Sequence, residues 1–195
     1  MRVTELRTIH PATTALLIMD VEPSIVAQLP DADAFIGGLL RAREAARTAG
    51  LTVGYVRVAL TADDVATVPA SNLTFHAAAV TGRLLDGPDT EVDPRIAPGD
   101  DEIVVRKSRV GAFSTTDLGE QLAGRGVDTL VLCGIATSGV VLSTVRDAAD
   151  HDFSIIVLED GCFDRDPEVH RVLTEKVFPR QGEVVSIDDF IASLA

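Results

Sequence analysis

Short apolar runs alternate along this chain with segments in which apolar residues recur at helical spacing. The run TALLIMD (14–20) is continuously apolar and ends in an acid, which is typical of a strand buried on both faces of a parallel sheet. Further strands are predicted at 51–60, 101–107, 128–134, 154–160 and 183–187. Helices are predicted at 31–50, 115–125, 138–151, 165–177 and 188–194. The alternation predicts an α/β fold with a doubly wound parallel sheet of six strands and right-handed crossovers.

Residues 61–100 interrupt this alternation. Pro and Gly recur there, and the strand periodicity is lost. A segment of this length between two strands is usually a lid or a binding loop. We expect such a loop here, with one short helix at about 73–85.

Length and charge limit the class of protein. With 195 residues, 46% of them hydrophobic, the chain is expected to form one globular domain over residues 1–195. Its net charge of −13 argues against a nucleic-acid partner, because phosphate backbones are bound through clustered Lys and Arg. A small molecule is the expected ligand instead.

The cysteines and the N-terminal segment indicate the compartment. Cys133 and Cys162 lie in or beside apolar runs and lack metal-ligand spacing, which is typical of a protein from a reducing cytoplasm. The N-terminal segment MRVTELRTIHPATT has no apolar signal-peptide core, and no apolar stretch approaches the ~18 residues of a membrane span. We therefore expect a cytoplasmic protein without a membrane partner.

Three segments that can carry chemistry are predicted to meet at one edge of the sheet. In an open parallel sheet, ligands bind beyond the carboxyl ends of the strands, where the strand order reverses. Asp20 ends the first predicted strand, Lys107 ends the third, and the turn 134–140 follows the fourth. An acid, an amine and a helix N-terminus, which favours negative charge, are therefore expected to converge.

Three stretches resemble the signatures of the isochorismatase-like hydrolases, members of the cysteine hydrolase superfamily. They are TALLIMDVEPS, VVRKSRVGAFSTTDL and GIATSGVVLSTVRDAADHDFSIIVLEDGC, in the family's order within residues 12–165. The resemblance implies a three-layer, Rossmann-like fold whose six strands have the order 3-2-1-4-5-6. It also implies a homo-oligomer, a dimer or a tetramer. We expect no cofactor.

The resemblance further implies a catalytic triad like that of the amidase members. In that arrangement Asp20 is the general base, Lys107 keeps Asp20 ionised and orients the substrate, and a cysteine at position 140 attacks a carbonyl carbon. The family pattern also places a cis peptide between Ile135 and Ala136, which helps to aim backbone N–H groups at an oxyanion.

Position 140 departs from this pattern because it is valine, which has no nucleophilic atom. Cys133 is expected to be a small buried hydrophobe, and the acids beside Cys162 are expected to raise the pKa of its thiol. Ser138 is expected to cap the helix that follows it. No histidine lies nearby in the sequence to activate this serine as a nucleophile.

Two other branches of the family bear on the ligand. One branch hydrolyses vinyl ethers with the Asp as general acid and Gly at position 140, and Val140 is compatible with that chemistry. A dianionic substrate of this kind calls for arginines, for which Arg57, Arg83 and Arg109 are the local candidates. The nicotinamidase branch binds a metal through histidines after the second strand. This chain has VRVALTADD there, so no metal site is expected.

Glu22 stands two residues after Asp20, where the family usually has Gln. Its negative charge is expected to raise the pKa of Asp20, which would suit an acid role for that residue.

Together these inferences favour a hydrolase of this superfamily that cleaves amide or vinyl-ether bonds without a cysteine. Its pocket is predicted to contain Asp20, Lys107, Phe113 and the turn 135–140, with the backbone at Ala136 and Val140 holding a substrate oxygen. The alternative is a catalytically inactive member that binds a small molecule or regulates through the same pocket. A dinucleotide-binding oxidoreductase is disfavoured, since no Gly-x-Gly-x-x-Gly follows the first strand.

Overall fold

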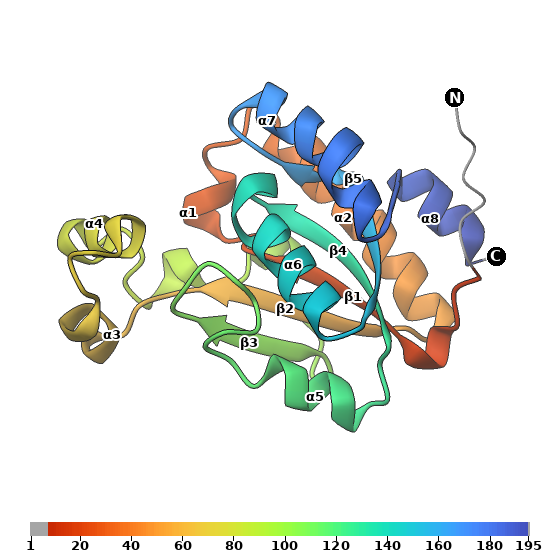
Figure 1. Cartoon of the computed structure of the whole chain (residues 1–195), viewed down its shortest axis with the longest axis horizontal. Coiled ribbons are helices and arrows are strands. Elements are labelled where there is room, and N and C mark those ends of the chain that lie inside the picture. Colours follow the sequence, from red (N-terminus) through yellow and green to blue (C-terminus); the bar gives the residue numbers. More distant parts are fainter. Residues whose placement is uncertain (1–7, 195) are drawn as a thin grey trace.

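Six parallel strands form one sheet in the order β3-β2-β1-β4-β5-β6 (Figure 1). The computed structural model of the protein describes residues 8–194. The strands are β1 (Thr14–Met19), β2 (Thr52–Val58), β3 (Ile103–Lys107), β4 (Thr129–Ile135), β5 (Ser154–Phe163) and β6 (Glu183–Val185). The predicted doubly wound fold and strand order are therefore confirmed. The first seven residues of MRVTELRTIHPATT, the segment predicted to lack a signal-peptide core, lie outside the described range.

Helices cover both faces of this sheet and give the fold its three layers. α2 (Ala32–Ala49) and α8 (Ile187–Ser193) pack on one face. On the other face lie α5 (Leu118–Gly124), α6 (Leu142–Asp150) and α7 (Pro167–Val172), which continues into the wide turn η5 (Leu173–Val177). The shorter elements of the chain are η1 (Pro11–Thr13), α1 (Pro23–Val26), η2 (Pro88–Thr90), η3 (Pro94–Ile96) and η6 (Phe178–Arg180). None of the described helices combines the length and the apolar character that crossing a membrane requires.

The central strand β1 is buried along its whole length. Ala15, Leu17 and Met19 belong to the core beneath α5 and α6. Leu16 and Ile18 belong to the core beneath α2 and α8. Because both faces of the strand are covered, its sequence is continuously apolar and does not alternate with polar residues.

Helix α2 begins and ends at the residues that the sequence indicates. Asp31 Oδ1 accepts a hydrogen bond from Ala34 N at 3.0 Å, which satisfies one of the free N–H groups of the first turn. Gly50 ends the helix in the left-handed conformation, with φ of 81°. The helix therefore has both of its predicted end signals.

An arm, residues 59–86, projects from the body of the fold after β2 (Figure 1). It contains α3 (Ala62–Thr67) and α4 (Leu73–Thr81), so the prediction of a loop with one short helix was wrong for α3. The overlooked signal is a capping box, in which the Thr61 and Asp64 side chains each accept a hydrogen bond from the other residue's backbone N–H. Leu60 N donates to Leu84 O at 2.6 Å, which ties the two ends of the arm together.

Two arginines on neighbouring strands attach the arm to the sheet. Arg57 Nη1 lies 2.8 Å from Asp86 Oδ1, and Arg106 Nη1 lies 2.8 Å from Asp64 Oδ2. Inside the arm, Phe75 packs in a small apolar cluster of its own. The arm thus forms a fixed wall beside the carboxyl ends of the strands.

Strand β5 continues three residues beyond its predicted end. Its register against β4 shifts between Leu132 and Gly134, so that Gly134 pairs with Cys162 and Ile135 with Phe163. The prediction that Cys162 lies beyond the end of this strand is therefore wrong, because Cys162 is part of the strand. The longer strand carries the residues that follow Phe163 to the edge where β1 and β3 end.

We expect Gly134→Ala to destabilise the fold by about 3 kcal/mol or more, as measured by urea unfolding. Gly134 has φ of +140°, and a Cβ there would lie 2.0 Å from Met19 O, in the backbone of the central strand. Gly37→Ala in α2 is the matched control, because a Cβ there meets nothing within 4 Å. The control should be neutral or stabilising by up to about 1 kcal/mol. Equal unfolding free energies for the two variants would contradict this account of Gly134.

Candidate active site

A cavity of about 410 Å³ lies at the carboxyl ends of the strands. Its floor is made by residues at the ends of β1, β2, β3, β4 and β5, and one wall is made by the arm through Thr74, Phe75, Arg83 and Leu84. The size is in the range of pockets that enclose small molecules. The edge at which the sequence predicts a ligand site is therefore hollow.

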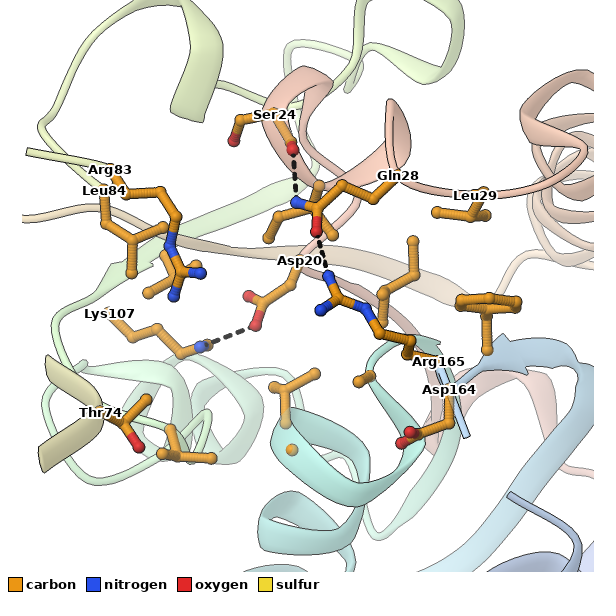
Figure 2. Close-up of a pocket in the computed structure, with 18 of the residues that line it drawn as sticks. Asp20, Ser24, Gln28, Leu29, Thr74, Arg83, Leu84, Lys107, Asp164 and Arg165 are labelled. Atoms are coloured by element: carbon orange, nitrogen blue, oxygen red, sulfur yellow. Dashed lines mark hydrogen bonds and ion pairs between the residues drawn. The ribbon is translucent and has the colours of Figure 1, made fainter. Parts of the chain in front are cut away.

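Asp20 and Lys107 form an ion pair at the floor of this cavity (Figure 2). Lys107 Nζ lies 2.9 Å from Asp20 Oδ2, and the two side chains are only 2% and 8% exposed. Lys107 Nζ also donates to Arg109 O at 3.1 Å. Asp20 leaves the strand in the left-handed region, with φ of 54°, a conformation that aspartate tolerates better than most residues. The structure thus brings together the acid and the amine on which the sequence prediction depends.

Burial raises the pKa of Asp20 to about 6, although the Lys107 charge and its hydrogen bond lower it. The predicted rise in the pKa of Asp20 therefore has the correct direction, but its predicted cause, the charge of Glu22, is wrong. Glu22 is itself completely buried, and Val58 N donates to Glu22 Oε1. Burial and the Asp20 charge raise the pKa of Glu22 to about 9, so Glu22 is neutral in the range where Asp20 titrates. The repulsion between the two carboxyls therefore acts on Glu22.

The turn after β4 borders the cavity on another side. The Ile135–Ala136 peptide bond is cis, and η4 (Thr137–Val141) follows as a wide helical turn that leads into α6. Ile135, Ala136, Gly139 and Val140 line the cavity, and Val140 is 2% exposed.

Two residues, one from the loop after β5 and one from α7, fix this turn in place. Asp164 Oδ2 accepts a hydrogen bond from Ser138 N at 2.8 Å, so the predicted capping role of the Ser138 side chain is wrong. The cap comes from Asp164 because the chain after β5 passes directly beside the turn. Behind it, Thr137 Oγ1 lies 2.8 Å from His170 Nδ1.

Two arginines line the cavity, Arg83, which is among the predicted candidates, and Arg165, which is not. Figure 2 shows the guanidinium groups of Arg83 and Arg165 on either side of Asp20. Arg165 Nη2 donates to Gln28 Oε1 at 2.5 Å, and Gln28 Nε2 donates to Ser24 O at 2.9 Å. Within residues 8–194, neither arginine forms an ion pair. Both are thus available to an anionic ligand.

The other two candidate arginines have different roles. Arg57 is engaged by the carboxylates of Asp86 and Glu91, at 2.8 and 3.3 Å. Arg109 donates to Ser108 O at 2.5 Å, and its guanidinium lies 5.7 Å from the centre of the Phe75 ring. Arg165 could have been predicted from its place just after the fifth strand, in the stretch FDRDPE. Because that strand was predicted to end at residue 160, Arg165 was expected to lie farther from the edge of the sheet than it does.

Phe113 is not brought to this cavity. Its ring stacks on His151 and Phe153, with centroid distances of 5.6 and 6.0 Å. The reason is that the loop after β3 folds over α6, where Ala112 N donates to Thr144 Oγ1 at 3.3 Å. The expectation that Phe113 contributes to the pocket is therefore not met in the structure.

The two cysteines lie below the cavity in the sheet. Cys133 and Cys162 are buried, and neither lines the cavity. Burial raises the pKa of Cys133 well above its usual value and that of Cys162 to about 12, with Asp160 adding to the rise at Cys162. In the described part of the chain, no three His, Cys, Asp or Glu side chains are grouped as metal ligands.

The chain belongs to the isochorismatase family, since the isochorismatase domain matches residues 14–189. It is 39% identical over 95 residues to the isochorismatase family protein YecD of Escherichia coli O157:H7, covering 49% of this chain and 50% of that protein. N-carbamoylsarcosine amidase of an Arthrobacter species is 29% identical over 174 residues, covering 89% and 66%. The matched regions thus span about half and about two thirds of these curated relatives.

A solved structure supports the same assignment. An isochorismatase family protein from Burkholderia thailandensis superposes with a TM-score of 0.83 at 27% identity, covering 97% of this chain and 99% of that one. The family predicted from the three signature stretches is therefore confirmed.

We expect Lys107→Met to destabilise the fold by about 3–5 kcal/mol at pH 8, because it leaves the Asp20 carboxylate buried without its cation. Lys107 lowers the pKa of Asp20, so its removal raises that pKa above 6. When the pKa of a carboxyl is higher in the folded than in the unfolded state, the free energy of unfolding falls as the pH rises from the unfolded-state pKa to the folded-state pKa. The loss should therefore be much smaller at pH 4.5, where Asp20 is protonated in the variant.

Urea unfolding at the two pH values measures this difference. Arg41→Met is the control, because it removes an exposed ion pair with Asp188 and should cost less than about 1 kcal/mol at both pH values. A loss at Lys107 that is independent of pH would show that Asp20 does not depend on this cation.

Proposed function

We propose that this protein hydrolyses small anionic amides of the carbamoyl type, with Asp20 and Lys107 as its reactive groups and without a covalent thiol intermediate. The observation that carries the proposal is the buried Asp20–Lys107 ion pair at the floor of a cavity of small-molecule size. A carboxylate and an ammonium in contact, both withdrawn from water, have perturbed proton affinities of the kind that proton-transfer sites require. The family membership and the likeness to an enzyme named for action on N-carbamoylsarcosine support the amide class.

Asp20 supplies the acid–base step in this proposal. With a pKa of about 6, the Asp20 carboxylate is ionised at pH 7, and this pKa is close enough to pH 7 for the carboxylate to take up a proton during the reaction. Asp20 accepts a proton from a water molecule as the water oxygen bonds to the carbonyl carbon. It then returns the proton to the leaving nitrogen as the C–N bond breaks. Lys107 stabilises the negative charge of the Asp20 carboxylate before the first proton transfer and after the second.

Position 140 explains why water is the proposed nucleophile. The family signature places the attacking thiol at this position, and here a buried valine side chain lines the cavity. The native cysteines, Cys133 and Cys162, are buried thiols with raised pKa values and do not reach the cavity. Direct attack by water needs no group at position 140. A vinyl-ether substrate, protonated at carbon by Asp20, is the variant of the same chemistry that also needs no thiol.

The cations around the cavity favour an anionic substrate. Arg83 and Arg165 approach from the arm and from the loop after β5, and Lys107 lies at the floor. Arginine binds carboxylates through paired N–H donors, and such charge-assisted hydrogen bonds are strong in a site withdrawn from water. In a chain with a net charge of −13, this gathering of cations at one cavity is a local feature.

A second candidate function is the binding of the same small anions without turnover. The apolar Val140 side chain favours it, because it stands where the amidase members have their nucleophile. The cavity, the ion pair and the arginines would then serve recognition alone.

We expect Asp20→Asn to lower kcat/KM by about 10²–10⁴-fold on the best substrate from a panel of N-carbamoyl amino acids, other small amides and vinyl ethers. Wild-type turnover should survive treatment with iodoacetamide, since both thiols are buried. Retained binding with no turnover by wild type, measured by calorimetry, would establish the binding function in place of the hydrolase. Turnover that is abolished by iodoacetamide would contradict the thiol-free mechanism.

We expect Arg165→Gln to raise KM for a carboxylate-bearing substrate about tenfold with little change in kcat, because one charge-assisted hydrogen bond is lost from ground state and transition state alike. The corresponding uncharged amide should bind wild type and variant equally. Arg41→Gln, at an exposed arginine outside the cavity, is the matched control. An equal rise in KM for charged and uncharged substrates would show that Arg165 acts on the shape of the pocket and not on charge.

A further inference from the structure

Two buried carboxyl oxygens beside the cavity have no hydrogen-bond partner within the described residues. They are Asp20 Oδ1 and Glu22 Oε2. The second oxygen of each carboxyl is held, Asp20 Oδ2 by Lys107 Nζ and Glu22 Oε1 by the N–H of Val58. A buried oxygen without a partner costs free energy, so each such atom in a folded protein requires an explanation.

The Glu22 side chain turns away from the helix that it precedes. Glu22 directly precedes α1, at the position from which Ser, Thr, Asp or Asn side chains commonly cap the free N–H groups of a helix. Glu22 makes no such cap. Its side chain is instead completely buried and turned to the end of β2, where it accepts from Val58 N. The Glu22 carboxyl is thus withdrawn from water and does not serve the helix end.

Three charged residues face Glu22. They are Asp20 from the end of β1, Lys107 from β3 and Arg57 from β2. Arg57 is already engaged by Asp86 and Glu91. Among the described residues that face Glu22, Lys107 is therefore the buried cation left for two buried carboxyls, and like charges so placed cannot both ionise easily. One of the two carboxyls keeps a proton.

Glu22 is the carboxyl that keeps it at neutral pH. Burial and the Asp20 charge raise the pKa of Glu22 to about 9, whereas the pKa of Asp20 rises to about 6. Oε1 of Glu22 accepts from Val58 N, so the proton belongs on Oε2. A proton there turns one of the two unpartnered oxygens into a donor, while the other, Asp20 Oδ1, is a buried acceptor without a donor. The charge of Asp20 acts on Glu22, so the two carboxyls lie within electrostatic reach of each other.

We propose that Glu22 is a positioning residue that acts as a neutral acid, its Oε2 proton serving Asp20 Oδ1 while Lys107 serves Asp20 Oδ2. Both oxygens of Asp20 are then fixed, and the floor of the cavity carries one negative charge against one positive charge. The consequence for catalysis rests on the proposed hydrolase function. The arrangement itself does not, because it concerns the resting charge state of the site.

Carboxyl ¹³C NMR titration of the protein labelled in Asp and Glu side chains tests the arrangement without any substrate. In wild type we expect Asp20 to titrate near pH 6 and Glu22 near pH 9. Glu22→Gln should remove the upper transition and leave the midpoint of Asp20 in place, because an amide N–H can donate where the acid O–H did and its oxygen can still accept from Val58 N. Glu22→Leu removes the donor and should raise the midpoint of Asp20 by about one pH unit or more.

Glu91→Gln is the control, because Glu91 is an exposed carboxyl that also lies beside Arg57. It should leave both buried titrations unchanged. The proposal is overturned if Glu22 of wild type titrates near its ordinary value of 4.5, or if Glu22→Leu leaves the Asp20 midpoint where it is in wild type. If Glu22→Leu does not fold, the wild-type and Glu22→Gln titrations still decide, because a shifted Asp20 midpoint in Glu22→Gln contradicts the exchange of one neutral donor for another.

Where a substrate is found, the pH profile of kcat/KM adds a readout that a purely structural role would not move. Wild-type activity should fall above about pH 9 as Glu22 ionises, and Glu22→Gln should keep its activity there. The two proposals fail separately. Absence of turnover with the expected titrations refutes the hydrolase alone, and turnover with an ordinary Glu22 titration refutes the role of Glu22 alone.

Discussion

The buried pairing of Asp20 with Lys107 is the interaction around which the site is built. Asp20 directly follows β1 and Lys107 ends β3, and β2 lies between these strands, so the two side chains together bridge two interstrand spacings, about 10 Å in all. The parallel register makes this reach possible, because Lys107 lies opposite Val58 and Met19 lies opposite Val56, so that all three strands end at one edge. Transferring two charges from water into the protein costs desolvation free energy that their attraction can fail to offset. A buried ion pair is therefore weak evidence for stability and better evidence for a functional site.

The electrostatics of the cavity differ from those of the whole chain. The sequence contains seventeen Lys and Arg residues and thirty Asp and Glu residues. Three of the cations, Lys107, Arg83 and Arg165, nevertheless line one cavity, together with Asp20 and Asp164. Surface acids more than about 10 Å away are largely screened by salt, whereas groups within the cavity are screened far less. The local arrangement therefore decides what binds, and the net charge of the protein does not.

The elements of the fold follow from residue patterns that are local. β1 is continuously apolar because both of its faces are covered, and α2 carries both of its end signals in the sequence at Asp31 and Gly50. The arm was harder to predict. α3 is only six residues long, and its capping box stands in a segment where Pro and Gly conceal helical periodicity. Short elements of this kind are fixed by contacts such as Arg106 with Asp64, which no periodicity reveals.

The candidate site was predictable only where a residue ends a strand. Asp20, Lys107 and the turn at 135–140 lie at the ends of their strands or directly after them, so the topology alone places them at the cavity. Phe113 and Arg165 depend on the paths of loops, and the loop paths place Phe113 over α6 and Arg165 at the cavity rim. The effect of Glu22 depends on burial, which decides that Glu22 and not Asp20 bears the repulsion between the two carboxyls.

The sequence by itself determined the parallel sheet, its strand order through the family signatures, and the absence of a reactive side chain at position 140. These are properties of periodicity and residue identity, which do not depend on where other segments lie. Tertiary structure alone decided the charge state of the floor, the arginines that reach the cavity and the cap that Asp164 gives to the turn. Proton affinity and hydrogen-bond partnership depend on solvent exclusion and on distances between segments far apart in the chain, and only the folded packing sets those.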